Sequence, residues 1–297
     1  MRPWGMVRWI RISVVGLVVV ALVGSALVVL GWTIDERHFA RPDAGFDRLT
    51  TRMDALAGVD VRHAERWVEA PTFSDPSSWI ELEVDAAHLP EALAAVCAAE
   101  HPDAVALTLL VDAGASTTVT VHDEVPEAGD ASGPRCFDPG FDVVGLADAA
   151  GRLVPGIDLQ PTLWEDGRFA LASLEYDLGD ITDMLPLVAH ADELRDAAGL
   201  APGQPVQIDS MTVGVTVWPD EHERWPALLD ELVTEHGVTS VYADDGSTQT
   251  DGVAKVQVSA PEEAHAAVEA RIRASALAIA EYPVRFLPLD GSEISDE

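Results

Sequence analysis

Histidines and carboxylates are the side chains in this sequence that could bind a metal or move protons, and their spacing favours neither role. The chain has 9 histidines and 51 acidic residues. His222 lies between Glu221 and Glu223, and His63 lies close to Glu65. Neither histidine has a second one at the helical spacing of a zinc site. We therefore expect no metal, and we interpret both as surface histidines among acids.

Motifs for nucleophilic catalysis and for nucleotide binding are missing as well. The chain contains no G-x-S-x-G, no H-E-x-x-H, no P-loop and no dinucleotide-binding glycine pattern. Glu100-His101 and Glu235-His236 recur near the ends of two predicted helices, where the negative end of the helix dipole favours a histidine. The sequence therefore identifies no catalytic residue and no cofactor, and an enzyme is not the function that it favours.

An acidic loop late in the chain has the residue types of a calcium site. Asp244, Asp245 and Asp251 lie in it together with Ser247, and Ca²⁺ prefers such oxygen ligands. The EF-hand template requires acids at alternate positions before its glycine, and the spacing here is different. We therefore interpret residues 244–252 as a hairpin loop made of turn residues, with a calcium site as the alternative.

The two cysteines, Cys97 and Cys136, are predicted to form a disulfide because the topology derived below places both in an oxidising compartment. Closing this loop would contribute about 3–4 kcal/mol in the chain-entropy model. The alternative is that Cys97, which follows Leu93 and Val96 at helical spacing, is a free buried residue. Neither cysteine has the C-x-x-C neighbour that zinc or redox chemistry requires.

The stretch 12–32 has no charged residue and is rich in Val and Leu. A helix of this length spans the hydrocarbon core of a bilayer. Arginines within 1–11 precede the stretch, whereas Asp35 and Glu36 follow it, so the positive-inside rule places the N-terminus in the cytoplasm. The sequence thus predicts a single-pass protein of the plasma membrane with its ectodomain outside.

A cleaved signal peptide is the alternative interpretation of this stretch. Signal sequences have a shorter apolar region that ends in small residues. Here the small residues 24–26 are followed by the apolar residues 27–30. We therefore favour an uncleaved signal anchor.

The composition excludes nucleic acid as a partner of the ectodomain. The formal net charge is −33, which repels phosphate backbones and anionic lipid headgroups. Such a charge could attract cations or a basic partner. It also suits solubility or a biased codon usage, because Lys255 is the only lysine and asparagine is absent. A hydrophobic content of 48% indicates a folded ectodomain with a real core.

Apolar periodicity predicts two α+β modules after a short stalk at residues 33–45. The first module, 46–122, has the predicted elements helix 46–58, strand 59–69, strand 80–84, helix 88–100, strand 105–112 and strand 117–122. Moving the first helix and strand to the end gives the order of a ferredoxin-like split β-α-β fold. This order predicts a circularly permuted ferredoxin-like sandwich, an antiparallel sheet backed by two helices.

The second predicted module covers residues 166–288. It follows a loop-rich connector at 123–165, which contains a short helix at 143–150. An acidic tail at 289–297, predicted to be disordered, comes after it. Its predicted elements are strand 168–176, helix 183–199 capped by Asp183, strand 206–217 with a bulge near Asp209-Ser210, helix 225–237, strands 238–243 and 253–258, a helix from 261 to 279 and strand 282–287. This is the ferredoxin-like order without permutation.

The two predicted modules also resemble each other. The stretch from Trp79 to Asp112 aligns with that from Val213 to Asp245 as strand, loop, helix and strand, with Glu-His near the end of each helix. This similarity indicates an internal duplication. A chance match of two common β-α-β units is the alternative.

Three functions are compatible with these features. The first is a binding or assembly module in the cell envelope, with an envelope protein that the sequence does not identify as its partner. The second is an extracytoplasmic sensor of a cation or ligand, and the third is a surface enzyme that uses carboxylates. A deep pocket with convergent acids would favour the enzyme, whereas flat sheets with an exposed apolar patch would favour the binder.

Overall fold

The structure is a computed structural model, and it describes residues 28, 37–70, 75–99, 104–125, 136–173, 180–247 and 252–288. The predicted membrane span 12–32 lies outside these residues except for Val28, and the segments 1–11 and 289–297 lie outside them entirely. In the described ranges, no helix combines the length and hydropathy that crossing a bilayer requires.

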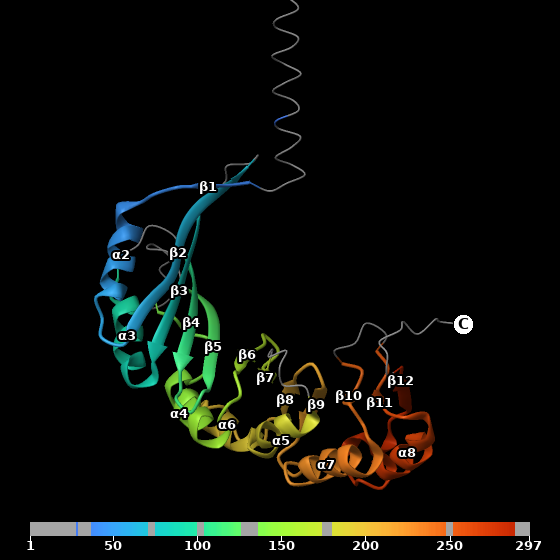
Figure 1. The fold of residues 1–297 in the computed structure, drawn as a ribbon. Helices are drawn as coiled ribbons and strands as arrows, with labels where there is room; N and C mark the ends of the chain where they lie inside the picture. Colours follow the sequence, from blue (N-terminus) through green and yellow to red (C-terminus); the bar gives the residue numbers. More distant parts are fainter. Residues whose placement is uncertain are drawn as a thin grey trace, which may run out of the picture.

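Two β-sheets backed by helices form a crescent, with the helices on its outer side (Figure 1). The first sheet contains, in spatial order, β1 (Arg37–Ala40), β2 (Val59–Ala70), β3 (Ser77–Asp85), β4 (Val105–Asp112) and β5 (Thr118–Val125). The second contains β6 (Gln160–Leu163), β7 (Phe169–Ala172), β8 (Val206–Asp209), β9 (Val213–Val217), β10 (Ser240–Asp244), β11 (Lys255–Ser259) and β12 (Val284–Leu287). The predicted α+β class with two helix-backed sheets is therefore confirmed.

The helices alternate with pairs of strands. They are α2 (Ala44–Asp54), α3 (Leu89–Cys97), α4 (Val143–Leu153), α5 (Ile181–Ala189), α6 (Ala191–Ala197), α7 (Arg224–His236) and α8 (His265–Arg273), with short 3-10 turns at Ala86–His88, Glu262–Ala264 and Ala278–Glu281. From β2 onward, antiparallel pairs such as β8–β9 alternate with parallel pairs such as β9–β10, which a helix connects. Successive β-β-α units therefore build both sheets in chain order.

This strand order corrects the prediction of ferredoxin-like modules with antiparallel sheets, because both sheets also contain parallel pairs. A split β-α-β unit places another strand between the two strands that a helix connects. Here β3 and β4, connected by α3, are direct neighbours, and so are β9 and β10, connected by α7. The predicted circular permutation of the first module is therefore wrong as well. The sequence pattern gives the order of elements along the chain, but it does not tell which strands pair.

The local patterns explain why individual elements form. In β3, Ile80, Leu82 and Val84 are buried against the helices, while the residues between them face the open side. In α7, a stripe of buried residues faces the second sheet, and the helix ends at Gly237, whose positive φ of 64° closes it as predicted. The apolar core accordingly lies between each sheet and its helices.

Two predicted elements of the second half are each divided in the structure. The predicted helix 183–199 is two helices, α5 and α6, separated at His190, and Asp180 rather than Asp183 caps the first. The predicted strand 206–217 is the hairpin β8–β9, in which the Ser210 hydroxyl accepts hydrogen bonds from the backbone amides of residues 212 and 213. The turn at Ser210 explains why the alternation of apolar residues slips there.

Helix α4 connects the two sheets within the predicted connector, and it contains the predicted helix 143–150. A Cβ atom on Gly151 would lie 2.1 Å from the backbone oxygen of Ala113, so the helix touches the β4–β5 turn at the backbone. At its other end, the Asp142 amide donates a 2.8 Å hydrogen bond to the Ala198 carbonyl after α6. The two sheets themselves meet at a parallel bridge between Val119 and Leu159.

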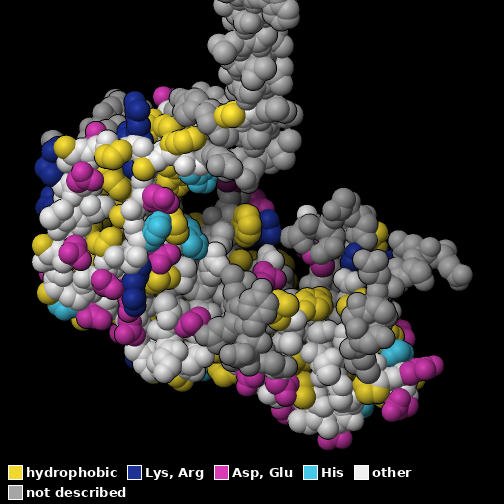
Figure 2. All heavy atoms as spheres, turned by 45° about the horizontal axis from the view of Figure 1, so that its top comes forward, with side chains coloured by type: hydrophobic (Ala, Val, Ile, Leu, Met, Phe, Trp, Pro, Cys, Tyr) yellow, Lys and Arg dark blue, Asp and Glu magenta, His cyan; other side chains and the backbone are white. Residues whose placement is uncertain are grey.

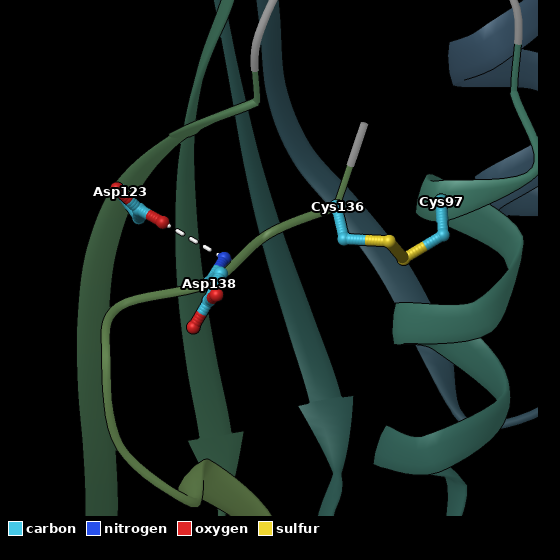
Figure 3. Close-up of a disulfide and its surroundings, with 4 residues drawn as sticks. All are labelled: Cys97, Asp123, Cys136 and Asp138. Carbon is cyan, nitrogen blue, oxygen red and sulfur yellow. Dashed lines mark hydrogen bonds between the residues drawn. A yellow bond between two sulfur atoms is a disulfide. The ribbon is translucent and has the colours of Figure 1, made fainter. Parts of the chain in front are cut away.

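The two cysteines lie at disulfide distance, as predicted (Figure 3). Cys97 ends α3 and Cys136 precedes α4, with 2.16 Å between the sulfur atoms and 4.3 Å between the Cα atoms. Close by, the Asp138 amide donates a 2.9 Å hydrogen bond to the Asp123 carboxylate on β5. The pair therefore attaches the segment before α4 to the first sheet.

Replacing Gly151 by alanine should lower the free energy of unfolding by about 1–3 kcal/mol, because the added methyl group meets the Ala113 carbonyl. The better helix propensity of alanine offsets only about 0.5–1 kcal/mol. Urea denaturation measures the change. Asp148→Ala, on the exposed side of α4 and in an exposed ion pair with Arg152, is the matched control and should have little effect. A Gly151→Ala variant as stable as the wild type would contradict the close approach.

Thiol labelling of the denatured, unreduced protein should find neither Cys97 nor Cys136 free. The double variant Cys97→Ser/Cys136→Ser should lose up to about 3–4 kcal/mol of unfolding free energy, because its denatured chain is no longer constrained. A reducing agent should destabilise the wild type and leave the double variant unchanged. Labelling of both cysteines without reduction would show that the disulfide does not form.

Candidate functional site

A pocket of about 320 Å³ lies on the open face of the second sheet. It crosses β8, β9, β10 and β11, and because its lining residues Gln207 and Asp209 alternate along β8 with the buried Val206 and Ile208, it lies on the side opposite the core. Its lining consists of Arg168, Pro205, Gln207, Asp209, Gly214, Val215, Thr216, Trp218, Tyr242, Ala243, Asp244, Asp245, Ser247 and Gln257. The pocket thus combines carboxylates, amides and aromatic rings on a rigid β surface.

Strand register places the central residues of the pocket in one row. Asp209 pairs with Gly214, Gly214 with Tyr242, and Tyr242 with Gln257, across four neighbouring strands. Successive side chains of a strand point to opposite faces, so the neighbours of these residues, such as Ile208, enter the core. The row is therefore a direct consequence of the pleat.

Gly214 leaves room for the Tyr242 ring above β9. A Cβ atom at this position would lie 2.7 Å from Cδ1 of Tyr242 and 3.7 Å from Oδ1 of Asp209. The tyrosine hydroxyl donates a hydrogen bond to the Met211 carbonyl, which holds the ring in this position. The ring and the Asp209 carboxylate consequently both border the space above Gly214.

A chain of hydrogen bonds orders the polar wall of the pocket. The Arg168 guanidinium donates to the Gln207 side-chain oxygen at 3.2 Å, and the Gln207 amide donates to Asp209 Oδ2 at 2.8 Å. Arg168 also pairs with Asp166 at 2.7 Å and lies over the Trp164 ring at 5.6 Å. The guanidinium is thus held by groups at the rim, and the Asp209 carboxylate accepts from an amide.

The environment shifts the protonation of several groups around the pocket. Burial raises the pKa of Asp209, and it outweighs the Gln207 hydrogen bond and the attraction of Arg168, which both lower it. Burial also raises the pKa of Tyr242. Hydrogen bonds from the Ser247 side chain and backbone lower the pKa of Asp245, so this carboxylate is ionised at neutral pH. The pocket therefore holds one carboxylate in a poorly solvated position and another that is firmly charged.

The acidic loop that the sequence identified contributes to this pocket through Asp244, Asp245 and Ser247. Asp244 Oδ1 accepts from the Gly246 amide at 2.6 Å, and Asp245 Oδ1 accepts from the Ser247 amide at 2.8 Å. These are turn hydrogen bonds, in line with the predicted hairpin loop between β10 and β11. Asp251 lies outside the described residues.

The histidines that the sequence offers as possible metal ligands lie apart from one another. His63 faces Glu65 at 3.4 Å on β2, and His222 contacts the Pro219 carbonyl at 2.7 Å and Asp192 at 3.4 Å before α7. Among the described residues, no group of three or more histidines, cysteines or acids is placed to hold a metal ion.

Sequence reasoning missed Arg168, Gln207, Asp209 and Tyr242 as site residues. The slip in alternation near Asp209 is the available signal, and by itself it indicates only a bulge. Polar side chains on an open sheet face look alike in a sequence, whether they form a pocket or face solvent. Comparisons with protein-family models, with curated proteins and with solved structures give no match.

Asp209→Asn should stabilise the unliganded protein at neutral pH. Because folding raises the pKa of Asp209, the ionised carboxylate costs stability above its folded-state pKa, and this cost disappears below the unfolded pKa of about 4. Asparagine keeps an oxygen that can accept from Gln207. Urea denaturation should therefore show a more stable variant at pH 7.5 and a smaller difference at pH 3.5. Equal or lower stability of the variant at pH 7.5 would contradict the desolvation of Asp209.

Proposed function

We propose that this protein is a single-pass, membrane-anchored protein whose acidic ectodomain lies outside the cell and binds a partner in the cell envelope. The uncharged stretch 12–32, with arginines before it and acids after it, supports the anchor and the orientation. The concave surface of the crescent is the binding face in this proposal.

The observation that carries the proposal is the one-sided arrangement of the helices. In the described part of the chain they cover the convex side, and the concave side presents bare strands (Figure 1). Hydrophobic, acidic, basic and histidine side chains border the hollow of the crescent (Figure 2). An apolar sheet face that is exposed to water is energetically unfavourable. Aromatic residues that are exposed among polar ones therefore favour a recognition surface.

The open face of the first sheet has the same mixed character. The Trp79 indole donates to Thr108 Oγ1 at 3.2 Å, and Thr108 in turn contacts His122 Nδ1 at 2.9 Å. The His63 ring packs on Trp79 with 4.6 Å between centroids. These residues come from four neighbouring strands, so ordered aromatic and polar groups line the concave side of both sheets.

A photo-crosslinking amino acid at Thr216, in the pocket, should give a discrete adduct in membranes of the source cell. The same amino acid at Glu235, on the exposed side of α7, is the matched control and should give none. Full-length protein is used, so that the anchor keeps the ectodomain near its partner. Adducts at both positions with equal yield, or at neither, would contradict binding through the concave surface.

A further inference from the structure

The charges that line the second-sheet pocket are mainly negative. Asp209, Asp244 and Asp245 contribute carboxylates, and Arg168 is the cationic residue of the lining. Asp244 lies opposite Lys255 in the β10–β11 ladder, so a cation is already close to it. Asp209 and Asp245 are the remaining carboxylates of the lining, and the positive charge of Arg168 acts on both of them.

The arginine does not reverse this balance. Its guanidinium is held by the Asp166 carboxylate at 2.7 Å and by the Gln207 side-chain oxygen at 3.2 Å, and it stacks over Trp164. A bound anion would compete with Asp166 for these donors and would face Asp209 and Asp245 at close range. The pocket consequently disfavours an anionic ligand.

Aromatic rings form the other walls of the pocket. Tyr242 lies over Gly214 with no side chain beneath it, and Trp218 at the end of β9 is 43% exposed. Ring faces attract cations, and this attraction grows when the site is shielded from water. A half-buried carboxylate in a pocket that such rings also line is a receptor for an ammonium or guanidinium group.

We propose that this pocket binds a lysine or arginine side chain of a partner polypeptide, with Asp209 and Asp245 as ionic partners and Tyr242 and Trp218 as aromatic walls. This inference rests on the proposed function, because it names the chemistry of the partner on the concave surface. A volume of about 320 Å³ suits one long side chain, and the open sheet surface around it leaves room for the flanking residues of a chain. The net charge of −33 would speed the approach of a basic partner.

A neutral sugar could also stack on aromatic rings, but it fits the site less well. Asp209 accepts a hydrogen bond from Gln207, and burial opposes its ionisation. A hydroxyl group would add a neutral hydrogen bond, whereas a cation would compensate the buried negative charge itself. The observations therefore favour the cation.

The test measures binding of short peptides to the full-length protein in detergent by calorimetry. The probes are acetyl-Gly-Ser-Lys-Ser-Gly-amide, the same peptide with acetyl-lysine, spermidine and a neutral oligosaccharide. The lysine peptide should bind at least about tenfold more tightly than the acetyl-lysine peptide, and its affinity should fall with salt. Asp209→Asn should weaken it by about tenfold or more, since a charge-assisted contact is lost.

Asp230→Asn is the matched control, because it removes the same charge from the exposed side of α7, outside the pocket. Equal weakening by the two variants would mean non-specific attraction and would overturn the proposal, as would equal binding of the two peptides. Tighter binding of spermidine than of the lysine peptide would overturn the choice of a polypeptide as the partner. Tighter binding of the oligosaccharide would overturn the choice of a cationic group as the ligand. If Thr216 gives crosslinks while the lysine peptide does not bind, the binding surface stands and this inference fails.

Discussion

The whole structure depends on the way parallel strand pairs are connected. Each β-α-β connection moves the chain to the adjacent strand, and such connections nearly always have the same handedness. Because β6 to β12 succeed one another in one direction, every connection of the same hand places its helix on the same side. One face of the sheet is thereby covered, and the other remains open. The apolar core, the crescent shape and the exposed concave surface all follow from this constraint.

Helix α4 continues this pattern of helix-connected parallel strands across the junction between the two sheets. It follows β5 and precedes β6, and the bridge between Val119 and Leu159 is parallel, as in the other helix-connected pairs. The close approach at Gly151 leaves no room for a side chain between the helix and the β4–β5 turn. Part of the segment that the sequence suggests as a loop-rich connector is helix α4 in the structure, and this part contacts the β4–β5 turn at one end and the residue after α6 at the other.

The open face of the second sheet contains positions that lower stability. A half-buried carboxylate such as Asp209 costs free energy when it is ionised, and Tyr242 requires a glycine on the neighbouring strand. Positions that lower stability without an evident structural benefit are expected at functional sites. The second-sheet pocket contains two such positions, whereas the helix-facing side of the same strands is uniformly apolar.

The sequence by itself determined the elements with strong periodicity, such as β3 and α7, and it predicted the pairing of Cys97 with Cys136. It also detected the similarity between 79–112 and 213–245, which correspond to equivalent β-α-β units of the structure. Only the tertiary structure decided which strands are neighbours, and hence that the modules are not ferredoxin-like and that Asp209, Gly214 and Tyr242 share one row. Periodicity reports which face of an element is buried, because that depends on local spacing. Strand partners depend on contacts between residues far apart in the chain, which local spacing does not encode.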